Sequence, residues 1–171
     1  LQIFTNHTVT LRNIAVSGFN TNVGAIQNFG TLILDSARMS NNHNSDSGGA
    51  VHNYGTVTIL NSSFLSNTAV NNGGVMINEG GAVTIDNSAF ISNSATSNAG
   101  AIYNFSGNVN VRGSRFSRNT AGLGGAILTV GELLVQSSAF TNNSAFDAGA
   151  LYVALAAPTQ VLSSTFTSNS A

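Results

Sequence analysis

The sequence predicts an all-β fold, a right-handed parallel β-helix (a solenoid) of about seven coils of about 25 residues. A tetrad Gly-Ala-Ile/Val-x, or a close variant, starts at Gly24, Gly49, Gly74, Gly100, Gly125 and Gly149, at intervals of 25, 25, 26, 25 and 24 residues. Between the tetrads lie short runs in which apolar and polar residues alternate, as they do along a strand. No ten-residue stretch shows the 3.6-residue period of a helix, which excludes helical repeats. A fixed period in this range indicates a stack of similar coils.

The clearest alternation falls in the same slot of each coil. Its copies are residues 31–34, 56–59, 82–85, 108–111 and 133–135. In the second copy, Val57 and Ile59 should point inward, and Thr56 and Thr58 outward. A second inward column consists of Ile26, Val51, Met76, Ile102, Ile127 and Leu151. Three strands of about three to five residues account for one coil, and each pairs in parallel with its copy about 4.8 Å away.

A third inward column begins at Met39 and continues as a stack of phenylalanines, which we interpret as core. Its phenylalanines are Phe64, Phe90, Phe116, Phe140 and Phe166. Crossovers between parallel strands are right-handed in nearly all known structures, which sets the hand of the predicted solenoid.

Asparagines form two further columns, which we interpret as structural ladders. One lies three residues after each member of the third inward column and contains Asn42, Asn67, Asn93, Asn119, Asn143 and Asn169. The other lies in Asn-x-Gly turns or a longer variant and contains Asn28, Asn53, Asn78 and Asn104. Asparagine tolerates the left-handed conformation and hydrogen-bonds neighbouring backbone, and stacked amides can bond to each other. The second column breaks at Thr129 and Val153.

Composition excludes several classes of function. Only 6% of residues are charged, the net charge is −1, and the basic residues are five arginines without a lysine. Such a chain cannot neutralise a run of phosphates, so we expect no nucleic-acid partner. No apolar run approaches the 18 residues of a membrane span, so we expect no membrane insertion by this segment. The absence of cysteine excludes thiolate catalysis and cysteine-based zinc sites.

A glycoside-cleaving enzyme needs two suitably spaced carboxyl groups, and one outward column offers candidates. Asp35 and Asp86 occupy this column two coils apart, near 10 Å, with Leu60 between them. Arg112 follows Asp86 in the next coil. We interpret these residues as surface charges and assign no catalytic residue. A polysaccharide lyase or hydrolase stays open as a second alternative.

The remaining titratable residues do not form a recognisable metal site. His43, Asp46 and His52 lack the spacing of known zinc motifs, so we expect a solvated loop and no metal or other cofactor. Glu79 and Glu132 have no basic residue near them in sequence, and we expect each to solubilise its turn.

The repeat resembles a known family of surface proteins. Gly-Gly-Ala-Val at residues 48–51 and Gly-Gly-Ala-Ile at residues 124–127, together with Phe-x-x-Asn, are similar to the repeat motifs of polymorphic membrane proteins. These are autotransporter adhesins whose passenger is a right-handed β-helix of pectin-lyase-like architecture. The resemblance covers essentially the whole chain and implies a non-enzymatic structural or adhesive scaffold, extracellular or on the cell surface. The partners that it implies are surface or matrix glycans and proteins. The family's β-barrel translocator has no counterpart in this sequence.

Hydroxyl side chains beside the first asparagine ladder suggest an alternative, ice binding. Two columns would present Ser66, Thr68, Ser92, Ser94, Thr120 and Ser144 as regular rows. A flat array of this kind resembles the surface of ice-binding proteins. Arg118 and Asn142 interrupt the rows.

Both ends of the sequence lie inside a coil, and no amphipathic helix covers either one. Uncapped edges of parallel sheets invite a further strand. We therefore expect residues 1–171 to form a single β-helix domain. It is either a segment flanked by repeats of the same chain or a subunit that stacks end to end with copies of itself into fibres.

Overall fold

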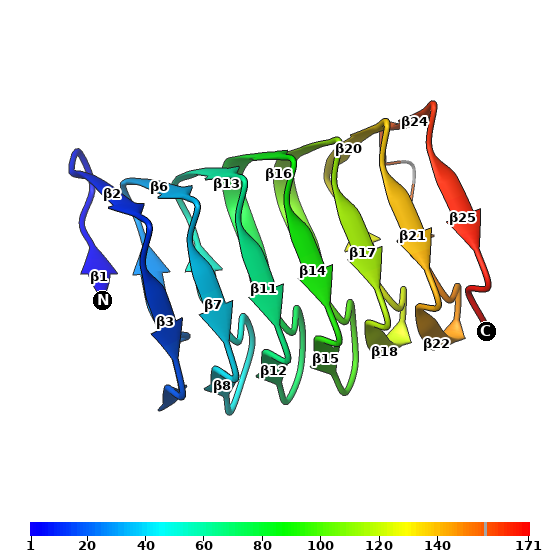
Figure 1. Ribbon diagram of the computed structural model, residues 1–171, viewed down its shortest axis with the longest axis horizontal. Helices are drawn as coiled ribbons and strands as arrows, with labels where there is room; N and C mark the ends of the chain where they lie inside the picture. The colour runs from blue at the N-terminus through cyan, green and yellow to red at the C-terminus, as the bar shows by residue number, and fades with distance from the viewer. Residues whose placement is uncertain (156) are drawn as a thin grey trace.

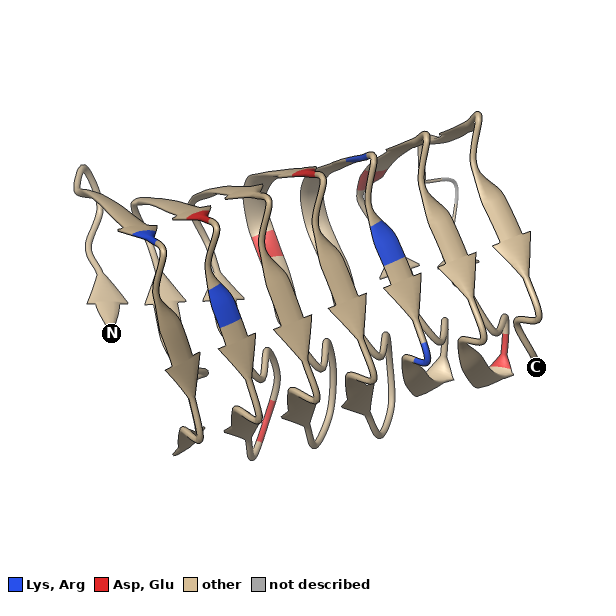
Figure 2. Cartoon of the chain, viewed as in Figure 1, with Lys and Arg blue, Asp and Glu red and all other residues tan. Residues whose placement is uncertain are grey.

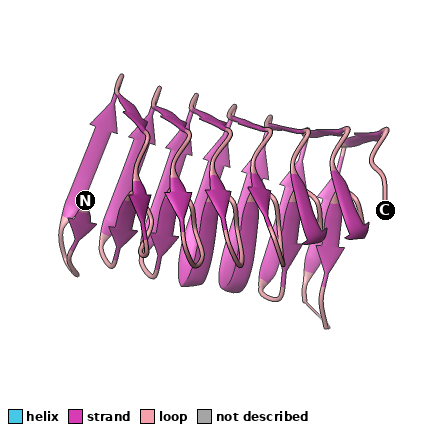
Figure 3. Cartoon of the chain, turned by 90° about the horizontal axis from the view of Figure 1, so that it is seen from below, coloured by secondary structure: helices cyan, strands magenta, loops and turns pink. Residues whose placement is uncertain are grey.

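The computed structural model describes residues 1–155 and 157–171, and they form one solenoid of stacked coils. Figure 1 shows the coils following one another along the long axis, with the two termini at opposite ends. All strand pairs within the sheets are parallel. The described residues contain no helix (Figure 3), and so none that is long and apolar enough to cross a membrane. The predicted parallel β-helix of about seven coils is confirmed.

Each coil but the last contributes strands to all three sheets, and the last contributes to two. The first sheet has twelve strands in two arms. One arm contains β1 (Gln2–Ile3), β5 (Ile26–Asn28), β9 (Val51–Asn53), β19 (Ile127–Thr129) and β23 (Leu151–Val153). The other contains β2 (Thr8–Arg12), β6 (Thr31–Asp35), β10 (Thr56–Leu60), β20 (Glu132–Gln136) and β24 (Thr159–Leu162). The arms join in two long strands, β13 (Met76–Asp86) and β16 (Ile102–Arg112).

The other two sheets are built from shorter strands. The second sheet contains β3 (Ala15–Ser17), β7 (Arg38–Ser40), β11 (Ser63–Leu65), β14 (Ala89–Ile91), β17 (Arg115–Ser117), β21 (Ala139–Thr141) and β25 (Thr165–Thr167). The third contains β4 (Asn20–Thr21), β8 (His43–Asn44), β12 (Thr68–Ala69), β15 (Ser94–Ala95), β18 (Thr120–Leu123) and β22 (Ser144–Asp147). The predicted strand count per coil is therefore wrong for most coils, which have four strands, some of only two residues.

The predicted inward columns form the core. Val57 lies opposite Leu32 and Val83, and Ile59 opposite Leu34 and Ile85, all of them buried. The phenylalanine column is a stack of nearly parallel rings, with neighbouring centroids 4.6–4.8 Å apart from Phe64 to Phe166. This distance is the spacing of the parallel strands, so each coil places its ring directly on the previous one.

Most coils have three corners at which a residue adopts the left-handed conformation. In the third coil these residues are Asn61 (φ 49°), Ser66 (φ 51°) and Gly73 (φ 61°). The ladder asparagines are not among the left-handed residues. Tolerance of positive φ is therefore the wrong reason for their presence, and hydrogen bonding is the right one.

Both asparagine ladders are present. In the first, Asn67 donates through its backbone N–H and its Nδ2 to Oδ1 of Asn93, at 2.9 and 3.1 Å. In the second, Asn28 Nδ2 donates to Asn53 Oδ1, and Asn53 Nδ2 to Asn78 Oδ1, both at 2.7 Å. The predicted break at Thr129 is wrong, because Asn104 Nδ2 donates to Thr129 Oγ1 at 3.1 Å. A threonine hydroxyl thus extends the ladder by one coil.

A buried serine ladder accompanies the asparagines and was not predicted. The backbone N–H of each serine donates to the hydroxyl of the next one, at 3.0–3.1 Å, along Ser62, Ser88, Ser114, Ser138 and Ser164. Its sequence signal is Ser-x-Phe, two residues before each ring of the stack. Buried serines thus join successive coils by hydrogen bonds, as the buried asparagines do.

Candidate binding surface

Outward side chains gather on one lateral surface, at the corner between the two arms of the first sheet. Phe29 and Tyr54 follow β5 and β9, and their rings stack at 4.8 Å with an interplanar angle of 3°. Further along the same corner, Tyr103 and Phe105 lie in β16 with ring centroids 6.0 Å apart and an interplanar angle of 57°. Phe105 is 51% exposed and Tyr54 38%. Four aromatic rings from three coils therefore lie along this corner, with Tyr54 and Phe105 the most exposed.

A histidine and a glutamate connect the aromatic pairs. His52 stacks on Tyr54 at 4.7 Å, and its Nε2 lies 3.0 Å from Glu79 Oε2. Glu79 has no basic residue near it in sequence, but stacking brings β9 beside β13 and so places His52, 27 residues away, against it. His52 likewise belongs to this surface and not to a solvated loop. Sequence proximity cannot reveal such a partner, whereas the 25-residue period can.

Both phenols on this surface keep their protons more strongly than a free tyrosine. Burial raises the pKa of Tyr54, and a hydrogen bond and the negative charge of Glu79 raise it further. Burial also raises the pKa of Tyr103, with a smaller contribution from the charge of Glu79. The two hydroxyls are therefore hydrogen-bond donors at neutral pH.

A cavity of about 270 Å³ lies inside this surface, and we call it the aromatic pocket. Its lining includes Asp46, Asn72, His52, Glu79, Tyr103 and Phe105. Asp46 Oδ1 accepts a hydrogen bond from Asn71 Nδ2 at 2.7 Å. The pocket thus combines two carboxylates, an amide, an imidazole and two aromatic rings.

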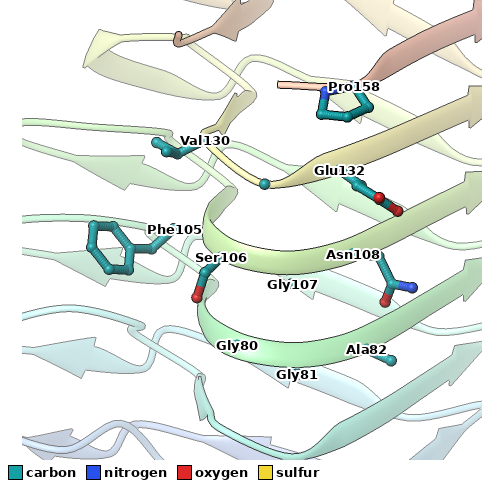
Figure 4. Close-up of a pocket in the computed structure, with 11 residues that line it drawn as sticks. Gly80, Gly81, Ala82, Phe105, Ser106, Gly107, Asn108, Val130, Glu132 and Pro158 are labelled. Atoms are coloured by element: carbon teal, nitrogen blue, oxygen red, sulfur yellow. The ribbon is translucent and has the colours of Figure 1, made fainter. Parts of the chain in front are cut away.

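A wider groove of about 660 Å³ begins on the other side of Phe105. Its floor is made of backbone at Gly80, Gly81, Gly107 and Gly131, where no side chain fills the space. Figure 4 shows Phe105 and Val130 on one side of this floor, and Asn108 and Glu132 on the other. Asn108 and Glu132 also line the next cavity, which continues across the strands to Gln160. The aromatic pocket and the groove therefore adjoin each other at Phe105.

The acidic residues considered for catalysis lie on a different part of the first sheet. Asp35 pairs with Arg12, whose Nε donates to Oδ2 at 2.8 Å. Leu60 lies between Asp35 and Asp86 in the register, as predicted, and Arg112 follows Asp86. Figure 2 shows charged residues scattered singly along the rod. Among the described residues, no three His, Asp or Glu side chains are grouped as a metal site.

The hydroxyl columns of the ice-binding alternative stand on either side of a corner. Ser66 and Ser92 occupy left-handed corner positions, whereas Thr68, Ser94, Thr120 and Ser144 lie in the third sheet. A buried asparagine, Asn67 or Asn93, separates the columns. In the first rows, His43 Nδ1 lies 2.8 Å from Thr68 Oγ1, so the histidine joins a hydroxyl column. Ice binding stays a prediction that no observation in the structure favours.

The aromatic surface was not identified from the sequence. Its signal was available, because the middle residue of the Asn-x-Gly turn is Phe29 and Tyr54 in consecutive repeats, and Phe105 follows Asn104. The asparagines and glycines of these turns explain the fold, whereas the residue between them points outward and is free to vary.

Comparison with known protein families matches a short segment of the chain. Residues 113–130 match the model of the Chlamydia polymorphic membrane protein repeat. This segment includes Phe116 and Asn119 of the ladder columns and the tetrad that starts at Gly125. The match and the solenoid together support the predicted resemblance to the β-helix repeat of that family, and they indicate a surface β-helix protein. No curated protein and no solved structure matches the chain significantly.

Proposed function

We propose that this chain is a non-enzymatic, extracellular scaffold whose β-helix displays an adhesive lateral surface. Support for a surface location comes from the repeat match, which covers residues 113–130. Support for a scaffold comes from the interior, where three ladders and the ring stack connect successive coils along most of the rod. A rod built in this way keeps its shape while its outward residues change.

The contrast between inward and outward columns is the observation that carries this proposal. The inward columns repeat the same residue types, whereas the outward column through Asp35 reads Arg12, Asp35, Leu60, Asp86, Arg112, Gln136 and Leu162. Catalysis of glycoside cleavage needs a fixed pair of carboxyl groups, and this column separates its two by Leu60. Display of varied side chains needs only a regular backbone and outward residues that differ from coil to coil, and this chain has both.

The two ends of the rod present different residues in the ladder columns. This difference decides which kind of coil can stack on the C-terminal end. Near the C-terminal edge, Asn143 donates its N–H to Asn169 Oδ1 at 3.0 Å, so the same geometry directs the Asn169 N–H toward a further coil. At the N-terminal edge the ladder columns contain apolar residues: Ile3 precedes Asn28, and Phe19 precedes Asn42. A second copy stacked head to tail would place Phe19 where Asn169 needs an acceptor. We therefore favour flanking coils of the same repeat over end-to-end fibres as the occupant of the C-terminal edge.

Adhesion and enzyme activity can be tested on the same purified chain. Beads that carry the chain should be retained on matrix-coated or cell-coated surfaces, while a panel of polysaccharides incubated with the chain should release no new reducing ends or unsaturated sugars. Release of sugar that Asp86→Asn abolishes would overturn the non-enzymatic proposal. Beads retained no better than beads with an unrelated protein of similar charge would overturn the adhesive one.

A further inference from the structure

We propose that the aromatic pocket binds one sugar ring of a neutral oligosaccharide, and that the glycine-floored groove receives the rest of its chain. This inference rests on the proposed display function and names the ligand class of its lateral surface. The pocket lies between three consecutive coils, with Asp46 and His52 from one, Asn72 and Glu79 from the next, and Tyr103 and Phe105 from the third.

The polar groups of the pocket suit the hydroxyls of a sugar. Glu79 and Asp46 are hydrogen-bond acceptors. Glu79 already faces the donors His52 and Tyr54, and Asp46 Oδ1 already accepts from Asn71 Nδ2 and Ser47 Oγ. A carboxylate offers about four acceptor sites, so both retain the capacity to accept ligand hydroxyls. The amide of Asn72 adds a donor to the wall, since its Nδ2 makes only a 3.2 Å bond to Ser47 Oγ.

The rings supply the apolar part of the site. A pyranose has a polar rim and a face of C–H groups, and that face packs on the negative face of an aromatic ring. Tyr103 and Phe105 meet at an angle of 57°, so they form two walls of a corner and not a flat stack. Phe105 lies between the pocket and the groove and lines both. Its ring would therefore stand beside the glycosidic bond that joins the sugar in the pocket to the sugar in the groove.

The charges of the pocket disfavour other ligands. Its ionisable groups are two carboxylates and one imidazole, and the sequence contains no lysine, so the carboxylates would repel an anionic ligand. An organic cation is best held by several ring faces around one charge. Here polar groups surround the cavity on several sides, which matches a ring with many hydroxyls better than a single positive charge.

The three strands that carry most of the pocket are hydrogen-bonded to one another through buried side chains. These strands are β9, β13 and β16. The second asparagine ladder joins them through hydrogen bonds between Asn53, Asn78 and Asn104. A site that is ordered in advance loses little entropy on binding. This compensates for the shallow, open form of the groove.

The test uses the whole chain and isothermal titration calorimetry with soluble neutral oligosaccharides of glucose, galactose, mannose and N-acetylglucosamine. At least one should bind saturably, and Phe105→Ala and Glu79→Gln should each weaken that binding about tenfold or more. Phe146→Ala is the matched control, because Phe146 is 90% exposed in β22 of the third sheet and loses the same side chain. This control should leave the affinity unchanged.

Several results would overturn the proposal. These are no saturable binding to any neutral oligosaccharide, equal effects of Phe105→Ala and Phe146→Ala, or binding only of choline or of oligogalacturonate, which test the cationic and anionic alternatives. Retention of chain-coated beads on protein matrix without any glycan binding would remove the sugar site and leave the adhesive scaffold standing. Cleavage of a bound oligosaccharide would instead remove the non-enzymatic scaffold.

Discussion

Asn93 connects neighbouring coils through one side chain. Its Oδ1 accepts from the backbone N–H and the Nδ2 of Asn67, and its Nδ2 donates to Phe64 O and to Asn119 Oδ1 at 3.1 and 3.0 Å. The side chain is completely buried. At the scale of the residue, the fold depends on amides that satisfy backbone groups at a corner where no strand can do so.

Replacing Asn93 by alanine should lower the free energy of unfolding by about 2–4 kcal/mol, because the buried N–H of Asn67 and C=O of Phe64 each lose a partner. Urea denaturation followed by circular dichroism measures the change. Asn110→Ala is the matched control, since Asn110 is exposed in β16, and it should change stability by less than about 0.5 kcal/mol. Equal losses in the two variants would show that the ladder does not stabilise the rod.

The raised pKa values of Tyr54 and Tyr103 predict how stability changes at high pH. In the unfolded chain both phenols ionise near the ordinary tyrosine pKa of 10.0, before they do so in the folded chain. The folded state then binds more protons, so this contribution is fully present below pH 10 and is lost as the pH rises through the folded pKa values. Absorbance titration of the phenols and urea denaturation between pH 9 and 11 test this. In the double variant Tyr54→Phe/Tyr103→Phe, stability should fall less steeply over that range, and an unchanged slope would contradict the assignment.

At the scale of the element, the tetrad corners explain why glycine recurs. The residue before the tetrad is left-handed, as at Gly73 and Ala99. The first tetrad glycine serves a different purpose: a Cβ on Gly100 would collide with backbone atoms of Thr120 and Gly125 in the next coil. Close approach of successive coils, and not positive φ, therefore requires glycine at this position.

Gly100→Ala should lower the free energy of unfolding by about 2–3 kcal/mol, because the coils on either side must separate to admit the methyl group. Gly18→Ala is a suitable comparison. At Gly18 φ is +73° and a Cβ would meet no atom within 4 Å, so only the conformational cost of about 1 kcal/mol remains. Thermal unfolding monitored by circular dichroism distinguishes the two. A smaller loss for Gly100→Ala than for Gly18→Ala would contradict the packing argument.

At the scale of the whole molecule, the rod is a stack whose edges are unlike. The C-terminal edge exposes 44% of Phe166 and presents ladder residues, whereas the N-terminal edge presents apolar residues in the same columns. A coil that continues the repeat fits the C-terminal edge in both its ring column and its amide column. A copy of the N-terminal coil fits the ring column alone, where Val16 precedes Met39.

Appending a copy of residues 96–121 after Ala171 should therefore raise the free energy of unfolding by about 2–3 kcal/mol, chiefly by burying Phe166. The appended coil would offer equivalents of Phe116 and Asn119 to Phe166 and Asn169. The control appends residues 96–101 followed by residues 1–21, which keeps Leu1 in the column of Ile26 and Ile102. It should stabilise less, since it brings Phe19 in place of asparagine. Urea denaturation of both fusions measures the difference, and equal stabilisation would reopen end-to-end stacking of copies.

Most of the fold was predictable because the period is exact to within one residue. Residues that align between repeats of the sequence stack on one another in the structure. The stacking of Phe90 on Phe64 and of Asn93 on Asn67 therefore follows from aligning the repeats. The strand lengths were harder to predict. β13 and β16 run through a corner with irregular register between Asn78 and Ala82, where Gly80 and Gly81 let the chain stay extended.

The sequence by itself determined the coil, the core columns and the amide ladders, because each depends only on which residue recurs at a given position of the repeat. The tertiary structure alone decided which outward residues meet, since side chains such as His52 and Glu79 lean across the strands and interact along the corner. The aromatic pocket and its groove exist for the same reason. They depend on the shape left between neighbouring coils, and that shape is set by ring angles and by missing Cβ atoms, which recurrence in the sequence does not specify.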